Sequence, residues 1–106
     1  MAEKIQKKAA KVGFDWPDVS GALEKLREEA GELEEAVRED TNVAEELGDL
    51  LFAAVNVARF VKVDPEDALS VACDKFARRF RQVEASAAAQ GKTLDEMTLA
   101  EMDRFW

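Results

Sequence analysis

Apolar residues recur at intervals of three and four through most of the chain, and no segment keeps a period of two. This spacing is typical of amphipathic helices rather than strands. The clearest stripe contains Leu23, Leu26, Ala30 and Leu33, and it predicts a helix over residues 18–39. We therefore expect an all-α fold.

Breaks in the pattern divide the rest of the chain into further helices. The stretch "GFDWPD" is typical of a turn. Asp64 is a predicted N-cap, and Pro65 would occupy the first position of the helix that follows. The other expected helices cover residues 2–12, 43–61 and 65–90, with a short helix after residue 98. The connections are short, which predicts a helical bundle of four main helices plus a short C-terminal helix.

Two pairs of residues have the spacing of a capping box. Thr98 and Glu101 would cap the short final helix, and Asn42 and Glu45 would cap the helix over 43–61, with asparagine in place of serine or threonine. That helix is apolar over a wide arc, so we expect it to be buried on several sides. A second copy of the chain could cover one of these sides.

Length and charge limit the class of protein. The chain has 106 residues, enough for one small domain, and a net charge of −8 from 23 acidic and 15 basic residues. This balance argues against nucleic acid or an acidic membrane as a partner. It does not exclude a small anionic substrate, because a bound metal ion inverts the local field.

The residue types that are scarce are equally informative. There is no histidine, which removes histidine-based acid–base catalysis, catalytic triads and histidine-containing zinc sites. Cys73 is the single cysteine, so no intrachain disulfide can form and a reducing compartment is expected. With no apolar run of membrane-spanning length and no signal-peptide pattern at the N-terminus, we expect a cytoplasmic protein.

Acidic residues in "REEAGELEEA" and "EELGDL" share one pattern. Glu29 and Glu32 lie three apart on one helix face, and Glu46 and Asp49 do the same on the next helix. The short connection between the two helices predicts that they run antiparallel. Four carboxylates should then converge on one place.

A cluster of four carboxylates can be interpreted in two ways. Carboxylates repel one another unless a cation bridges them, and a set of oxygen ligands without histidine or cysteine suits Mg²⁺, or Mn²⁺ as a substitute. The alternative is a solvated acidic face with partners one turn away, such as Lys25 with Glu29. The alternative suits Glu46 and Asp49 badly, because their neighbours are apolar.

The motif "EExxE" followed by "ExxD" resembles the signature of the MazG-type, all-α nucleoside triphosphate pyrophosphohydrolases. The stretches "KIQKKAAKVGFDWPD", "EELGDLLFAAVNVARF" and "DKFARRFRQVE" extend the similarity to the C-terminal catalytic domain of MazG proteins over nearly the whole chain. The resemblance implies one domain, residues 1–106, from a longer protein. It also implies a homodimer and a Mg²⁺-dependent enzyme that converts nucleoside triphosphates to monophosphate and pyrophosphate.

The resemblance further implies site residues. Glu29, Glu32, Glu46 and Asp49 would be metal ligands and catalytic groups. Lys75 and Arg79 would contact the triphosphate, although the residues alone favour ordinary surface charge. Trp106 would lie beside the base. From the sequence itself, Asn56 shares the carboxylate stripe and could bind substrate, and Phe14 and Trp16 are further aromatic candidates for the base.

Three alternatives stay open at this point. The first is a related pyrophosphohydrolase with a narrower substrate, such as dUTP, dCTP or phosphoribosyl-ATP. The second is a non-catalytic helical dimerisation module that binds metal for stability. The third is a helical interaction domain that is indifferent to Mg²⁺. The intact set of four acids argues against the last two.

Overall fold

The computed structural model describes residues 1–106, and all of its regular structure is helical. The elements are α1 (Ala2–Lys11), α2 (Val19–Glu39), α3 (Val43–Phe60), α4 (Pro65–Ala89), the 3-10 turn η1 (Leu94–Glu96) and α5 (Leu99–Asp103). These elements confirm the all-α class and the four main helices, and η1 was not predicted. The chain divides into two compact units, Met1–Pro65 and Glu66–Trp106. The prediction that all the main helices form one bundle stays a prediction.

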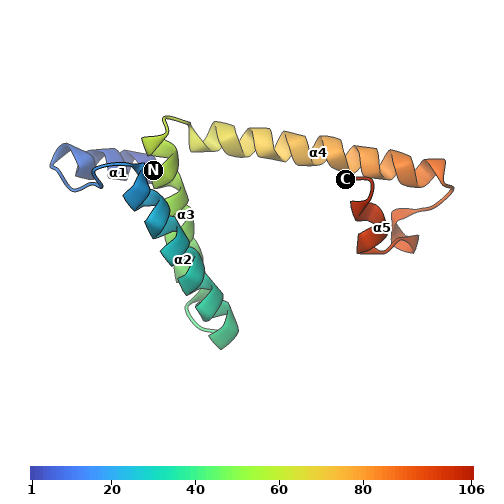
Figure 1. Ribbon diagram of the computed structural model, residues 1–106, viewed down its shortest axis with the longest axis horizontal. Coiled ribbons are helices and arrows are strands. Elements are labelled where there is room, and N and C mark those ends of the chain that lie inside the picture. Colours follow the sequence, from blue (N-terminus) through green and yellow to red (C-terminus); the bar gives the residue numbers. More distant parts are fainter. The chain divides into compact units, whose positions relative to one another are not determined.

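The first unit is built on the contact between α2 and α3, which lie side by side and antiparallel (Figure 1). Helix α1 packs on α3. The buried apolar side chains of this unit are small, namely Ala22, Ala36 and Ala53. A core of alanines lets neighbouring backbones approach closely but buries little apolar area.

The larger apolar residues of α3 remain partly exposed. Leu47 and Phe52 are each 44% exposed and Leu51 is 58% exposed, and Ala53 is the one buried residue of the helix. The expectation that α3 is buried on several sides is therefore wrong for the single chain. Only α1 and α2 pack on it within the unit, and two helices cannot cover so wide an apolar arc.

A three-residue connection joins α2 to α3. Asp40 and Asn42 both have left-handed backbones, with φ of 53° and 55°, and the N–H of Thr41 donates to the carbonyl of Ala36. Aspartate and asparagine tolerate this conformation better than most residues. The Asn42 side chain makes no capping hydrogen bond, so the capping box predicted with Glu45 is wrong.

In the loop between α1 and α2, Gly13 has a φ of 85°, and the N–H of Phe14 donates to the carbonyl of Ala9. This glycine ends α1 in the way that left-handed C-terminal residues usually do. The Asp18 side chain accepts from the N–H of Ser20 and caps α2. Between these ends the ring of Trp16 lies on Gly21, where a Cβ atom would come within 2.8 Å of it.

The second unit consists of α4 and the segment that follows it. Its buried apolar residues are Val83, Ala87 and Met97. Gly91 at φ 71° turns the chain back, and the Thr98–Glu101 capping box predicted for the last helix is confirmed. None of the helices is both long enough and apolar enough to cross a membrane.

Two glycines of α2 should respond oppositely to alanine. In Gly31→Ala the new methyl meets no neighbouring atom, so the variant should gain about 0.5–1 kcal/mol from helix propensity. In Gly21→Ala the methyl displaces the Trp16 ring, which should cancel that gain and lose about 1 kcal/mol or more. Thermal unfolding followed by circular dichroism measures both. Equal stabilisation by the two substitutions would show that Trp16 does not need this contact.

Candidate active site

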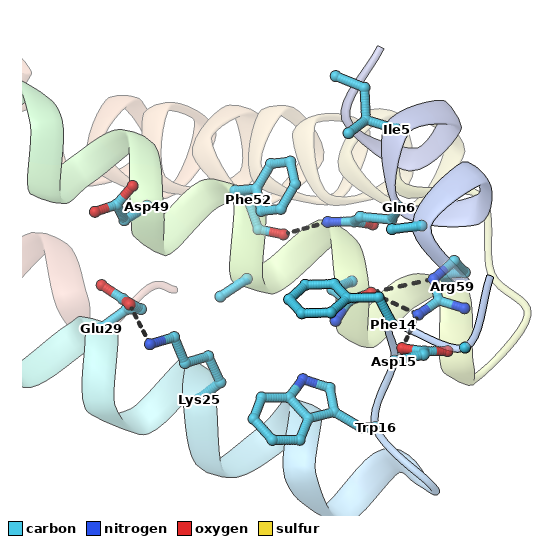
Figure 2. A pocket seen from close by; sticks show the side chains of 14 residues that line it. Ile5, Gln6, Phe14, Asp15, Trp16, Lys25, Glu29, Asp49, Phe52 and Arg59 are labelled. Carbon is cyan, nitrogen blue, oxygen red and sulfur yellow. Dashed lines mark hydrogen bonds and ion pairs between the residues drawn. The ribbon is translucent and has the colours of Figure 1, made fainter. Parts of the chain in front are cut away.

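Three of the four predicted acids come together between α2 and α3. Glu29 of α2 and Glu46 and Asp49 of α3 each offer a carboxylate oxygen, and these oxygens lie within 4.8 Å of one another. Glu46 and Asp49 share a face of α3 because they are three residues apart. The antiparallel packing of α2 brings Glu29 opposite them, and Figure 2 shows Glu29 and Asp49 facing across the gap.

Glu29 is only 7% exposed, although its side chain is a carboxyl group. One of its oxygens, Oε1, lies 3.0 Å from the Lys25 ammonium, and the other, Oε2, is buried without a hydrogen-bond partner. The hydrogen bond to Glu29 raises the pKa of Lys25, with the charge of Glu28 adding to the effect against partial desolvation. Lys25 therefore neutralises and orients one side of Glu29 and leaves the other side open toward Asp49.

Glu46 is the most electrostatically strained of the acids. Its Oε2 is buried without a partner. Desolvation raises the pKa of Glu46, and the negative charges of Glu32, Asp49 and Glu29 raise it further. A raised pKa means that the folded protein holds the proton more tightly than the unfolded chain does. Ionisation of Glu46 therefore disfavours the metal-free fold.

Glu32, the fourth predicted acid, does not belong to this close group. The residue is exposed, and its oxygens are not among those that meet within 4.8 Å. It is still near enough for its charge to raise the pKa of Glu46. The structure thus assembles three acids and places the fourth beside them, and the ligand role of each stays a prediction.

The group has the properties that a hard divalent cation requires. Every donor is a carboxylate oxygen, which suits Mg²⁺ or Mn²⁺. Acidic side chains often cluster on surfaces, but two residues of this group, Glu29 and Glu46, each have an oxygen, Oε2, that is buried and unpaired. A buried carboxylate oxygen normally has a partner. A cation held among the three residues would supply it.

A cavity of about 690 Å³ extends from these acids to the N-terminal loop (Figure 2). It is lined by Ile5, Gln6, Ala9, Gly13, Phe14, Asp15, Trp16, Lys25, Glu29, Asp49, Phe52, Ala53, Asn56 and Arg59, all from the first unit. Its size falls within the range of small-molecule sites. The lining combines an acidic end with aromatic rings, and it includes Asn56, as well as Phe14 and Trp16, among the residues singled out from the sequence.

Arg59 ties the N-terminal loop to α3. Its Nε and Nη2 donate to Asn56 Oδ1 at 3.1 and 2.9 Å, and Nη2 also forms an ion pair with Asp15. The hydrogen bond from Arg59 is the main reason that the pKa of Asp15 lies below its ordinary value. Because Asp15 lies between Phe14 and Trp16, the ion pair holds both aromatic residues at the cavity.

Sequence reasoning missed Arg59 and also Gln6, which is buried in α1 and donates to the carbonyl of Phe52 at 2.8 Å. Both residues lie in stretches that carry the family resemblance, but neither belongs to the acidic motif or interrupts the helical periodicity. The one usable signal for Gln6 was a polar residue beside Ile5 on a helix whose lysines are otherwise solvated.

The remaining predicted site residues, Lys75, Arg79 and Trp106, belong to the second unit. The Arg79 guanidinium lies 5.6 Å from the centre of the Trp106 ring, and Phe76 packs on the same ring at 4.9 Å. Lys75 is exposed on α4. The structure thus brings Arg79 and Trp106 together. The substrate-binding roles of all three stay predictions.

Comparison with known proteins identifies the family. Residues 18–84 match the model of the MazG nucleotide pyrophosphohydrolase domain. The whole chain is 45% identical to the nucleoside triphosphate pyrophosphohydrolase/pyrophosphatase MazG of Thermotoga maritima, and 99% of it is 43% identical to the nucleoside triphosphate pyrophosphohydrolase of Escherichia coli K12. It spans 41% of the length of each of these relatives. A shorter match, 52% identity over 61% of the chain and 13% of the relative, is to the uncharacterized protein YabN of Bacillus subtilis.

The matched segment, residues 18–84, contains α2 and α3 and therefore all four acids of the candidate site. It covers more than half of the chain, and the similarity to both pyrophosphohydrolases extends beyond it at both ends. The chain belongs to the MazG nucleotide pyrophosphohydrolase domain family.

Proposed function

We propose that this protein hydrolyses nucleoside triphosphates to the nucleoside monophosphate and pyrophosphate. The observation that carries the proposal is the group of Glu29, Glu46 and Asp49, with two buried carboxylate oxygens unpaired, at one end of a cavity large enough for a nucleoside. The names of the two relatives that match along the whole chain describe the same reaction.

In this proposal Glu29, Glu46 and Asp49 hold Mg²⁺, with Glu32 as a further ligand or as a base beside them. When bound, the ion would neutralise phosphate charge and lower the pKa of a coordinated water. Lys25 orients Glu29, since its ammonium lies 3.0 Å from Oε1 and leaves Oε2 without a protein partner. Without this partner, Glu29 would be a buried charge with no compensation.

The reaction needs a water molecule and a group that accepts its proton. Water attacks the α-phosphorus, a new phosphorus–oxygen bond forms, and the bond to the oxygen that bridges the α- and β-phosphorus breaks. Pyrophosphate leaves with the bridging oxygen. Glu32 is suited to orient the water and take its proton, because it is exposed and outside the close group of acids.

The organic part of the nucleotide fits the other end of the cavity. Phe14, Trp16 and Phe52 supply flat apolar surface for a base, and Asn56 supplies a polar group near them. Lys75 and Arg79 would contact the triphosphate, as the family resemblance of the "DKFARRFRQVE" stretch implies. Trp106 would lie on the base side, stabilised by its contacts with Arg79 and Phe76.

A homodimer is part of the proposal. The half-exposed Leu47 and Leu51 of α3, one turn apart, form an apolar face that the first unit does not cover. A second copy that packs on this face would bury it. Sedimentation equilibrium of the intact chain decides the point, since a monomer at micromolar concentration would contradict it.

The alternative functions can be distinguished by which nucleotides are hydrolysed and by whether Mg²⁺ stabilises the protein. A pyrophosphohydrolase with a narrow substrate would turn over one nucleotide, such as dUTP or dCTP, and ignore the others. A dimerisation module that binds metal would be stabilised by Mg²⁺ without any turnover. The raised pKa and unpaired oxygens of the acid group favour a site that takes up a cation, which argues against a domain indifferent to Mg²⁺.

Product analysis tests the reaction. Incubation with the common ribo- and deoxyribonucleoside triphosphates and Mg²⁺ should yield monophosphate and pyrophosphate, and EDTA should abolish the yield. Glu46→Gln and Asp49→Asn should each lower kcat by more than about 100-fold, beyond what outer residues of metal sites contribute. Glu34→Gln is the matched control, because Glu34 is a solvated glutamate of α2 paired with Arg38. Diphosphate plus phosphate as products would contradict attack at the α-phosphorus.

Stability measurements test the metal site without turnover. The pKa of Glu46 is raised, so the metal-free protein should lose stability as pH rises from the ordinary glutamate value through the raised one. At neutral pH Glu46→Gln should therefore raise the Tm of the metal-free protein. Mg²⁺ should raise the Tm of the wild type much more than that of the variant. A wild type whose Tm is the same with and without Mg²⁺ would refute the site.

The basic residues of α4 can be tested in the same assay. Lys75→Gln and Arg79→Gln should each raise KM about tenfold, because each removes a charge-assisted hydrogen bond to phosphate. Arg81→Gln, a change of the same charge at an exposed position of the same helix, should leave KM within about twofold. Equal effects at all three positions would indicate general electrostatic attraction rather than contacts at Lys75 and Arg79.

A further inference from the structure

Gln6 is a buried polar residue with one half of its amide unused. The residue is 6% exposed, its Nε2 donates to the carbonyl of Phe52 at 2.8 Å, and its Oε1 is buried without a partner. The orientation of the amide follows from chemistry, because a carbonyl oxygen only accepts and Nε2 must therefore face it. Gln6 borders the cavity, and Oε1 is the one polar atom of its side chain that no protein group engages.

Asn56 presents the complementary group. Arg59 has only donors, so the Asn56 atom that its Nε and Nη2 contact must be the oxygen Oδ1. The Nδ2 group, with two N–H donors, is left for the cavity that Asn56 also borders. Gln6 and Asn56 are thus the two uncharged polar side chains of the lining, and each keeps one hydrogen-bonding group without a protein partner.

We propose that Gln6 Oε1 and Asn56 Nδ2 read the hydrogen-bonding edge of the nucleobase, and that Arg59 is the residue that positions Asn56. The inference rests on the proposed function and deepens it. The preferred base carries a donor for Gln6 and an acceptor for Asn56 on one edge. A site built around buried polar groups discriminates strongly against a ligand that leaves them unpaired.

The location of the two amides supports this role. Phe14 and Trp16 of the loop, held by the ion pair between Asp15 and Arg59, lie with Gln6 and Arg59 at the end of the cavity away from Asp49 (Figure 2). A nucleotide with its phosphates at the acids would extend its base toward this end. A purely structural Gln6 would need only the bond to Phe52, which leaves its buried oxygen unexplained.

Arg59 positions both the hydrogen-bonding group of Asn56 and the aromatic residues of the loop. The same guanidinium holds the Asp15 carboxylate and the Asn56 amide, so one side chain fixes both the aromatic wall and the donor. Lysine has a single ammonium without the planar fork and cannot hold both in this geometry. Arg59 does not need to touch the substrate for this purpose.

The test compares a base with both kinds of group and a base without a donor. ATP, GTP and ITP are ranked by kcat/KM, and the best of them is compared with purine riboside triphosphate, whose purine ring carries acceptors only. We expect the kcat/KM of the wild type to be about tenfold higher for the base that carries both a donor and an acceptor. This factor corresponds to roughly one hydrogen bond, which purine riboside triphosphate cannot form. Gln6→Met should remove about that factor for the complete base and leave purine riboside triphosphate within about twofold.

The second variant, at Asn56, keeps the oxygen that accepts from Arg59 and replaces only the amide nitrogen. Asn56→Asp retains an oxygen for Arg59 and replaces the Nδ2 donor with an acceptor, so it should raise KM about tenfold and change the order of bases. Arg59→Lys should raise KM and weaken the discrimination between bases, which a merely structural role would not do. Gln82→Met, at an exposed position of α4, is the control for the glutamine change.

The outcomes separate the two claims. Pyrophosphate release by a wild type whose variants weaken all bases equally, or none, overturns the inference and leaves the proposed function intact. No pyrophosphate from any nucleotide overturns the proposed function. In that case the dissociation constants of α,β-methylene-ATP and of the same analogue of purine riboside triphosphate decide the inference. Tighter binding of the ATP analogue, lost in Gln6→Met and Asn56→Asp, upholds it, and equal or absent binding overturns it.

Discussion

The antiparallel contact between α2 and α3 is the constraint on which the site depends. It places Glu29 opposite Glu46 and Asp49, and like charges at such distances oppose the packing that brings them together. The first unit therefore combines a small alanine core with an electrostatic penalty at its centre. Lys25 offsets part of the penalty at Glu29. The remainder falls on Glu46, whose raised pKa records it, and a cation would remove it.

The two ends of the cavity differ in chemistry and in what holds them in place. Its acidic end lies where two helices bring charges together, while its aromatic end depends on a loop held by one arginine. In the function proposed here, the first end would take the phosphates and the second the base. Both ends lie within residues 1–65, so the geometry that links them does not depend on the second unit.

Sequence reasoning succeeded where spacing alone determines position. The three-residue intervals and the short connection between helices placed Glu29, Glu46 and Asp49 together, as observed. It could not place Gln6 or Arg59, because their importance comes from contacts between α1, the following loop and α3 that no periodicity encodes. It also overestimated the burial of α3, since apolar character predicts that a face needs a partner but not that the same chain supplies one.

The connection of Asp40, Thr41 and Asn42 has a further consequence. Its backbone is fixed by two left-handed residues, and the acids depend on the register that it sets. One inserted residue that propagated into α3 would rotate the helix by about 100° and shift it by about 1.5 Å, moving Glu46 and Asp49 away from Glu29. An added residue that stayed within the connection would only lengthen the turn and would leave Glu46 and Asp49 opposite Glu29. The position of the site therefore depends on where α3 begins relative to α2, rather than on the length of the loop itself.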